Sequence, residues 1–313
     1  MKKIVITGCS GFVGSHLIDY LLINEPSLGI WGVDILQPEK KYAENIYFTQ
    51  INLLAQDEFE NILGHVSPDY IIHLASFSSV ADSWRDPISC FKHNTNIFLN
   101  LLETMHVLRL RSRLLSIGSS EQYGIVPQDA LPLSEQTPLR PSSPYAAARI
   151  AQEHLSLIYA KSFNLDIVCT RSFNHLGPGQ PDKFVASSIA RQFARVAKGL
   201  QKNISVGNVT IIRDFIDVRD VVRGYHFLLK KGVPGEVYNI CSGTGIAIAD
   251  LIELFRQISG INPEVSIDAC LLRPVENPNV VGSFRKLQND TAWKPEITLK
   301  DSLTEMYNFW LAD

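Results

Sequence analysis

The segment KIVITGCSGFVGSHL at residues 3–17 constrains the fold more than any other part of the chain. An apolar run leads directly into Gly8, Gly11 and Gly14, and a helical pattern begins immediately after them. Glycines at this spacing let the backbone turn tightly and approach a pyrophosphate, and they seat the helix against the strand with its amino end facing the anion. The segment therefore predicts a strand, a tight turn and a helix that together bind a dinucleotide.

Short apolar runs alternate with longer amphipathic stretches through the first half of the chain. The runs are KIVITG, GIWGVDI, DYIIHLAS, RLLSIGSS and LDIVCTRSFN. Strands that are apolar on both faces indicate a parallel sheet covered by helices on both sides. We therefore expect an α/β fold, with a doubly wound, Rossmann-like sheet over 1–173, a return segment near 214–242, and a smaller substrate-binding lobe over 174–313.

Charge and cysteine content exclude several classes of protein. The chain of 313 residues has 29 lysines and arginines against 32 aspartates and glutamates, so we expect no nucleic acid partner. Its five cysteines lack CxxC spacing, and His73 has no second ligand at metal spacing, which argues against disulfides and a bound metal. We expect the cysteines to be buried.

The apolar runs also bear on location. Glycines interrupt the first run after a few residues, unlike a signal peptide, and no later run approaches the roughly 18 residues that span a bilayer. We therefore expect a soluble cytoplasmic protein with no membrane partner.

Asp34 is the next candidate, because it ends the strand pattern WGVDI that follows the first helix. A carboxylate at this place accepts hydrogen bonds from a ribose 2′-OH and repels a 2′-phosphate. The predicted cofactor is therefore NAD(H), with NADP(H) as the alternative. The alternative is a glycine-rich turn that binds no ligand, with Asp34 only marking the end of a strand.

Two later motifs supply polar groups for chemistry. SSEQYG at 119–124 ends an apolar strand pattern, so Ser119 is expected at the carboxyl edge of the sheet, where ligands of such folds bind. SPYAAAR at 143–149 begins a helix with Pro144, and Tyr145 and Arg149, four residues apart, share one helical face.

With HLAS at 73–76, RSFNHLGPGQ at 171–180, RDFIDVRDV at 213–221 and LLRPVEN at 271–277, these motifs resemble the extended short-chain dehydrogenases/reductases that act on sugar nucleotides. FNHLGPGQ, RPVENPNVVG and AWKPEITLKDSL are most similar to GDP-4-keto-6-deoxymannose reductases, which form GDP-rhamnose. The resemblance implies NAD(P)H-dependent reduction of the 4-keto group of a nucleotide-linked 6-deoxyhexose, with a GDP-linked substrate favoured. It also implies a homodimer through helices near 92–109 and 144–162.

The resemblance assigns roles to individual residues. Ser119 and Tyr145 would orient and protonate the keto oxygen, and Arg149 and Glu121 complete the catalytic candidates. The implied cofactor contacts are Gly8, Gly11, Phe12, Val13, Gly14, Asp34, Asn52, Leu53, Leu74, Ala75, Asn94, Tyr145, Arg149 and Phe173. The implied substrate contacts are Ser120, Asn174, Val185, Arg213, Arg273 and Glu276. Guanidinium groups suit phosphate oxygens because their donors are paired in one plane.

Arg149 departs from the family pattern, which is Tyr-x-x-x-Lys. The family lysine bonds the nicotinamide ribose, favours the ionised tyrosine and passes protons onward. Arginine can do the first two, since a positive charge about 4 Å from a phenolate stabilises it by roughly 4 kcal/mol at an effective dielectric near 20. The third is lost, because a guanidinium keeps its proton in a protein. We expect a working site, slower if anything; the alternative is an Arg149 that only pairs with a surface carboxylate.

Glu121 and Ser120 keep other functions open. In related sugar-nucleotide 4,6-dehydratases a matching glutamate acts as a base, so a dehydratase, or a C4 epimerase that retains its NAD(P), is the alternative activity. The simpler role for Glu121 is to shape the pocket. A non-catalytic dinucleotide-binding protein is the alternative of another class. The apolar positions 97, 98, 101, 102, 105 and 108 fit either the dimer interface or the core of one subunit.

Overall fold

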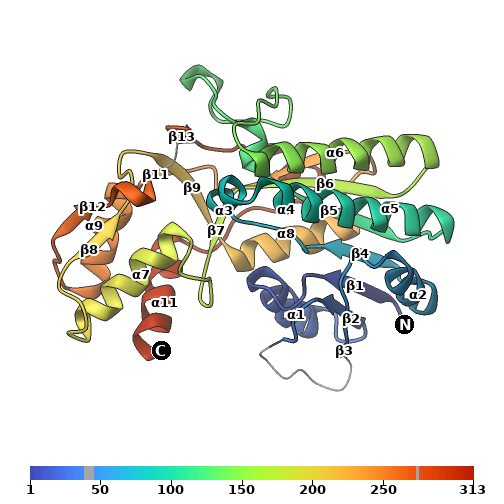
Figure 1. Cartoon of the computed structure of the whole chain (residues 1–313), viewed down its shortest axis with the longest axis horizontal. Coiled ribbons are helices and arrows are strands. Elements are labelled where there is room, and N and C mark those ends of the chain that lie inside the picture. The colour runs from blue at the N-terminus through green and yellow to red at the C-terminus, as the bar shows by residue number, and fades with distance from the viewer. Residues whose placement is uncertain (39–45, 273–274) are drawn as a thin grey trace.

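Seven strands form the central sheet of the computed structural model, which describes residues 1–38, 46–272 and 275–313 (Figure 1). The strands are β1 (Lys3–Thr7), β2 (Gly29–Asp34), β3 (Ile46–Gln50), β4 (Tyr70–His73), β5 (Arg113–Ser119), β6 (Ile167–Ser172) and β10 (Val237–Ile240). Their order is β10-β6-β5-β4-β1-β2-β3, and every neighbouring pair is parallel. The predicted doubly wound sheet is confirmed, and the strand order reverses beside β1, where such sheets bind their ligands.

Helices cover both faces of this sheet. α1 (Phe12–Asn24) and α8 (Val218–Lys231) pack together on one face, and α2 (Gln56–Val66), α5 (Ile97–Val107) and α6 (Pro144–Phe163) cover the other. Ile4 and Ile6 of β1 belong to the first apolar cluster, whereas Val5 between them belongs to the second. Because side chains of a strand alternate between faces, a strand covered on both sides must be apolar throughout.

A run of short helices leads into α5. It consists of α3 (Val80–Arg85), α4 (Pro87–Phe91) and a π-helical turn (Lys92–Asn96). The apolar positions 97, 98, 101, 102 and 105 are buried in the core on this face, and Leu108 packs against them. This apolar stripe therefore lies in the core of one subunit rather than on a dimer interface.

A second lobe lies to one side of the main sheet (Figure 1). Its strands are β7 (Asn174–Leu176), β8 (Ile204–Val206), β9 (Ile212–Asp217), β11 (Gly245–Ala247), β12 (Val265–Ile267) and β13 (Asn279–Val280), and its helices are α7 (Val185–Ala197), α9 (Ile248–Ser259) and α11 (Leu299–Ala312). Phe193 and Phe255 stack at 5.6 Å in its core, beside Met306. The remaining helix, α10 (Arg285–Thr291), contacts α8 and β10, and 3₁₀ turns span Ser120–Tyr123, Gln128–Ala130 and Ala269–Leu271.

The chain crosses between the two lobes more than once. β10 joins the main sheet beside β6 although β7, β8 and β9 precede it in the sequence. The division into 1–173 and 174–313 stays a prediction. Four cysteines are buried, but Cys270 is exposed, so the expectation of burial is wrong for that residue. None of the helices in the described ranges is both long and apolar enough to cross a membrane.

Candidate active site

The glycine turn between β1 and α1 has the geometry of an anion cradle. Gly8 has a φ of +72°, and a Cβ there would lie 2.5 Å from the amide nitrogen of Ala75. A Cβ on Gly14 would lie 2.5 Å from the carbonyl oxygen of Cys9. Gly11 caps the amino end of α1 without a side chain, and the first turn carries no acidic residue, so the first N–H groups of this helix suit the pyrophosphate of a dinucleotide.

Asp34 lies at the rim of this turn. Its Oδ2 accepts a hydrogen bond from the backbone N–H of Ser10 at 2.9 Å, and its Oδ1 accepts one from Leu36 at 3.2 Å. The carboxylate is thus fixed beside the glycine turn at the end of β2. Cys9, in the same turn, is a packing residue, because burial raises the pKa of its thiol to about 11.

The other cofactor candidates lie on the loops after β3 and β4. Leu74 donates its N–H to Thr7 at 3.0 Å, which holds Ala75 against Gly8. Asn52 is exposed just beyond β3, and Leu53 beside it is buried. The structure brings these loops to the same edge of the sheet as the glycine turn, because β3, β2, β1 and β4 are parallel neighbours.

Asn94 and Phe173 are buried. The Asn94 amide accepts a hydrogen bond from the N–H of Phe77 at 3.1 Å and donates to the carbonyl of Cys90 at 2.9 Å, so it fixes the loop after β4. Phe173 lies in an apolar cluster with Tyr123 and Cys241. Both side chains therefore shape the protein around the site, and a direct contact with a cofactor remains a prediction for each.

Ser119 is the last residue of β5 and caps the 3₁₀ turn that follows. Its Oγ accepts a hydrogen bond from the N–H of Glu121 at 3.2 Å, and its own N–H donates to Oε1 of Gln122 at 2.8 Å. The Ser119 hydroxyl proton is therefore available to another acceptor. Gly118 makes room for this arrangement, since a Cβ there would lie 2.5 Å from the same Gln122 oxygen.

Tyr145 and Arg149 meet on the buried face of α6. Ser143 caps the helix by accepting the N–H of Ala146 at 3.1 Å. Arg149 is only 4% exposed, and its Nε donates to the phenolic oxygen of Tyr145 at 3.2 Å. Its Nη1 donates to the carbonyl oxygen of Ile117 at 3.0 Å and to Gln152 Oε1 at 2.6 Å. Arg149 is thus not a surface group paired with a surface carboxylate.

His73 lies close enough to Arg149 for the positive charge of the guanidinium to affect it. Burial, and to a lesser degree the positive charge of Arg149, lowers the pKa of His73 to about 3. Its Nδ1 lies 2.8 Å from Oγ1 of Thr7, and its Nε2 has no hydrogen-bond partner among the described residues. His73 is therefore a neutral imidazole packed in the protein interior.

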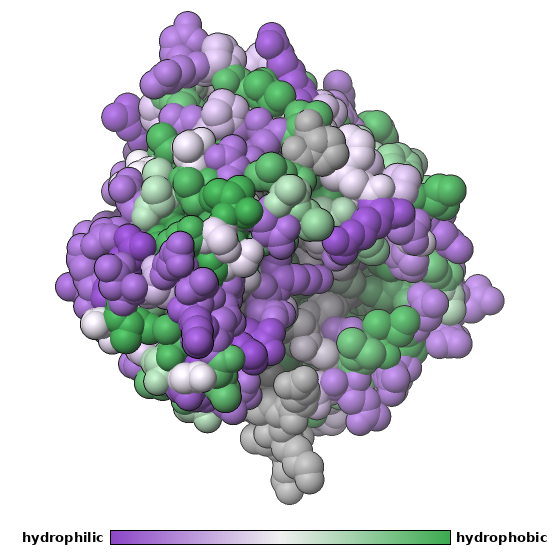
Figure 2. All heavy atoms as spheres, turned by 60° about the vertical axis from the view of Figure 1, so that its left-hand side comes forward, coloured by the Kyte–Doolittle hydropathy of each residue, from purple (hydrophilic) through white to green (hydrophobic). Residues whose placement is uncertain are grey.

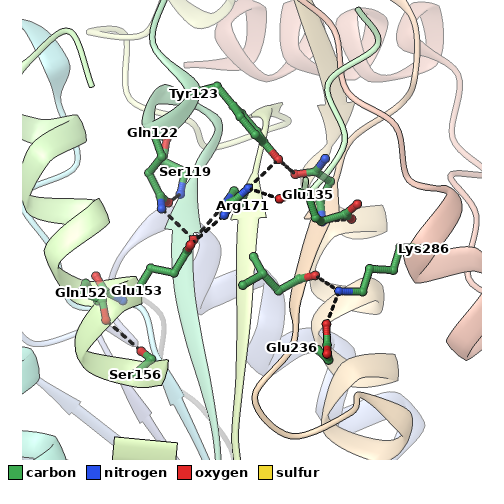
Figure 3. Close-up of polar contacts among 12 residues, drawn as sticks. Ser119, Gln122, Tyr123, Glu135, Gln152, Glu153, Ser156, Arg171, Glu236 and Lys286 are labelled. Carbon is green, nitrogen blue, oxygen red and sulfur yellow. Dashed lines mark hydrogen bonds and ion pairs between the residues drawn. The ribbon is translucent and has the colours of Figure 1, made fainter. Parts of the chain in front are cut away.

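A buried polar network that the sequence reasoning missed supports the Ser119 turn (Figure 3). Glu153 on α6 pairs with Arg171 on β6 at 2.7 Å, and its Oε2 accepts a hydrogen bond from Gln122 Nε2 at 2.8 Å. Arg171 also donates to the Tyr123 hydroxyl at 3.1 Å. The available signal was an arginine inside an apolar strand pattern, since a buried guanidinium needs a partner.

The substrate candidates come from both lobes. Asn174 on β7 pairs with Phe215 on β9, the strand that carries the buried Arg213. Glu276 accepts a hydrogen bond from Asn208 Nδ2 at 3.2 Å. Ser120 is buried beside Ser119, Val185 begins α7 at the surface, and Arg273 lies outside the described residues. Figure 2 shows hydrophilic side chains around a hollow on one face of the molecule. The binding roles of the substrate candidates named above stay predictions.

Comparisons with known proteins agree with the motifs. The family model described as GDP-mannose 4,6 dehydratase matches residues 5–306. The chain is 37% identical to GDP-6-deoxy-D-mannose reductase from Pseudomonas aeruginosa, over 99% of this chain and 97% of that protein. It is 26% identical to GDP-mannose 4,6-dehydratase from Yersinia enterocolitica, over 98% and 93% of the two chains.

Solved structures give the same result. The structure of RMD from Pseudomonas aeruginosa complexed with NADPH has a TM-score of 0.87 and 37% identity, covering 100% of this chain and 99% of that one. UDP-glucose 4-epimerase from Thermus thermophilus in complex with NAD has a TM-score of 0.88 and 27% identity, covering 98% of each chain. The chain therefore belongs to the GDP-mannose 4,6-dehydratase family of extended short-chain dehydrogenases/reductases, as its motifs predict.

Proposed function

We propose that this protein reduces the 4-keto group of a nucleotide-linked 6-deoxyhexose, with GDP-4-keto-6-deoxymannose as substrate and GDP-rhamnose as product. The observation that carries the proposal is the direction of two hydrogen bonds. The hydroxyl oxygens of Ser119 and Tyr145 both accept hydrogen bonds from the protein, from Glu121 N–H and Arg149 Nε. Neither hydroxyl donates a hydrogen bond to another residue in the part of the chain that the structure describes, so each can give its own proton to a substrate oxygen. Similarity to the Pseudomonas reductase supports the same reaction.

Each hydroxyl has a separate task in this reaction. Ser119 donates a hydrogen bond that polarises the carbonyl, and Tyr145 gives its proton to the oxygen as the C4 carbon is reduced. The bound nicotinamide supplies the hydride. General acid catalysis of this kind contributes about 10²- to 10⁴-fold to the rate.

Arg149 supports the tyrosine by charge and geometry. Once Tyr145 has given up its proton, the phenolate lies beside a permanent cation. The Coulomb attraction between the two charges stabilises the phenolate by roughly 4 kcal/mol at about 4 Å and an effective dielectric near 20. A guanidinium does not release a proton in a protein, so the proton that restores Tyr145 comes from water or through a hydroxyl.

The cofactor preference is part of the proposal. Asp34 stands at the rim of the glycine turn, where its carboxylate accepts hydrogen bonds from a ribose hydroxyl and repels a 2′-phosphate. We therefore assign NAD(H) as the preferred cofactor, with NADP(H) as the alternative. Arg213, Arg273, Asn174 and Glu276 are assigned to the sugar diphosphate and its ribose.

The proposed homodimer uses helices near 92–109 and 144–162. Apolar side chains that face solvent support this surface: Leu99 and Val107 on α5 are 37% and 58% exposed, and Ile158 on α6 is 54% exposed. These residues lie outside the buried stripe of the subunit core and would be covered by the same helices of a second copy.

The test is turnover of GDP-4-keto-6-deoxymannose with NADH and with NADPH. Loss of the nicotinamide absorbance together with formation of GDP-rhamnose is the expected result. Tyr145→Phe should lower kcat by about 10²- to 10⁴-fold while dinucleotide binding persists, and Tyr307→Phe on α11 serves as the matched control. Conversion of GDP-mannose without net cofactor consumption would identify a dehydratase instead. A protein that binds dinucleotide but is inert toward sugar nucleotides would be non-catalytic.

A further inference from the structure

We propose that Gln152 is a positioning residue that holds the Arg149 guanidinium with its Nε–H toward Tyr145. The proposal rests on the reductase function above, since it gives the role of Arg149 in that site a structural cause. Gln152 lies one helical turn beyond Arg149 on α6 and is 1% exposed. It touches the catalytic tyrosine only through Arg149.

The contacts of Gln152 fix the direction of its amide. Its Nε2 donates to the carbonyl oxygen of Ile117 and to Oγ of Ser116, both at 3.0 Å. Its Oε1 must then face Arg149, where it accepts from Nη1 at 2.6 Å. A flipped amide would bring two donors together at Arg149 and place its oxygen against the Ile117 carbonyl oxygen, which can only accept. The side chain is therefore held in one orientation.

The Ile117 carbonyl oxygen completes the arrangement. It accepts hydrogen bonds from both Arg149 Nη1 and Gln152 Nε2, at 3.0 Å each, so both of its lone pairs are used. Gln152 and Ile117 together fix Nη1, which sets the rotation of the planar guanidinium. Nε then points to the Tyr145 oxygen at 3.2 Å.

An arginine needs such support more than a lysine does. A guanidinium is planar and its donors point in fixed directions, so a rotated side chain loses the bond to the phenol even when its charge stays nearby. A lysine ammonium is a compact charge with three donors that rotate freely. Gln152 therefore compensates for the arginine at the position where the family pattern has lysine.

The double-mutant cycle of Gln152→Met and Arg149→Lys tests the proposal. Methionine is close in size to glutamine and removes both the acceptor for Arg149 and the donor for β5. In the parent background, Gln152→Met should lower kcat by about 10- to 100-fold, the scale of a small misplacement in an active site. In the Arg149→Lys background the same change should alter kcat by less than about 3-fold. The KM for the sugar nucleotide should stay within about 3-fold in every variant, because Gln152 acts through Arg149 on Tyr145.

Gln192→Met is the matched control for lost hydrogen bonds. Gln192 on α7 accepts from Ser205 N–H at 2.7 Å and donates to the Ser205 carbonyl at 2.9 Å. Its replacement should lower the midpoint of thermal unfolding without changing kcat. Equal losses of kcat from Gln152→Met in the parent and in the Arg149→Lys background, or no loss in the parent, would overturn the proposal.

Crystal structures of the parent and of Gln152→Met give a readout that needs no turnover. The Arg149 Nε should leave hydrogen-bonding distance of Tyr145 in the variant, and an unmoved guanidinium would refute the positioning role. A parent protein that oxidises no NAD(P)H with the keto sugar would defeat the proposed function instead, and these structures would still decide the role of Gln152.

Discussion

Arg171 and Glu153 form an ion pair inside the protein, with 2.7 Å between Nη2 and Oε1 and 6% of each side chain exposed. The pair joins β6 to α6, the helix that carries Tyr145 and Arg149. A second oxygen of Glu153 accepts from Gln122, whose own oxygen accepts the N–H of Ser119. The pair therefore supports the helix with the phenol and the turn with the serine at the same time.

Glu153→Gln should destabilise the protein by about 3–5 kcal/mol, because the change leaves the Arg171 cation buried without a counter-charge. Urea unfolding followed by circular dichroism measures the loss. Glu253→Gln is the matched control, since Glu253 pairs with Arg256 at 3.1 Å on the surface and is 54% exposed; its loss should stay below about 1 kcal/mol. Similar losses in the two variants would contradict a stabilising role for the buried pair.

Apolar patterning is enough to predict the sheet, but not the polar contacts inside it. The apolar runs around Val5 and Ile72 predict strands that are buried on both faces. A strand covered by helices on both sides buries every side chain, so most of its side chains are apolar. Which buried polar atoms meet depends on how α6 packs on β5 and β6. Glu153 and Arg171, or Gln152 and Ile117, are separated in sequence by a helix or a loop, and no periodicity relates them.

Other parts of the site were predictable for a local reason. The glycine turn and Asp34 follow from backbone conformation and strand ends, which are encoded within a few residues. Tyr145 and Arg149 share a face because they are four residues apart on one helix. The direction of the guanidinium was not predictable, because it depends on how Gln152 is turned and on the Ile117 carbonyl of β5, which is distant in sequence from α6.

Gly8→Ala should weaken dinucleotide binding, and Gly199→Ala should not. The two glycines share a left-handed backbone, with φ of +72° and +70°, so alanine costs each of them roughly 1–2 kcal/mol. A Cβ at Gly8 would also lie 2.5 Å from the Ala75 nitrogen, whereas a Cβ at Gly199 meets no described atom within 4 Å. Thermal unfolding and fluorescence titration with NADH compare the variants. Equal behaviour of both would mean that the close approach at Gly8 has no consequence for the turn.

His73 should make the protein less stable in acid. Burial, with a smaller contribution from Arg149, lowers the folded-state pKa of His73 from 6.5 to about 3. Between pH 6.5 and about pH 3, His73 is protonated in the unfolded chain but neutral in the folded protein. The contribution of neutral His73 to stability is therefore complete above about pH 6.5 and is lost as the pH falls. The contribution to the slope of unfolding free energy reaches about 1.4 kcal/mol per pH unit.

The His73→Gln variant isolates this contribution. Glutamine keeps a hydrogen-bonding group for Thr7 Oγ1 but does not titrate, so its unfolding free energy should fall less steeply between about pH 6 and pH 4. His154→Gln on the exposed side of α6 is the control for the loss of an imidazole. An unchanged slope in His73→Gln would show that the imidazole takes up its proton in the folded protein.

Asp34→Asn should move the cofactor preference toward NADPH. The amide oxygen still accepts the N–H of Ser10, the shorter of the two backbone bonds, while the bond from the Leu36 N–H and the charge that repels a 2′-phosphate are both lost. Removing the repulsion between this carboxylate and a 2′-phosphate should favour NADPH binding by on the order of 1 kcal/mol. The ratio of the dissociation constants for NADPH and NADH should therefore fall about 5- to 10-fold. Fluorescence titration with NADH and with NADPH measures that ratio. Asp57→Asn, at the exposed start of α2, should leave it unchanged. The same ratio in the Asp34 variant and the parent would mean that this carboxylate does not face the 2′ position, and the proposed preference for NAD(H) would be withdrawn.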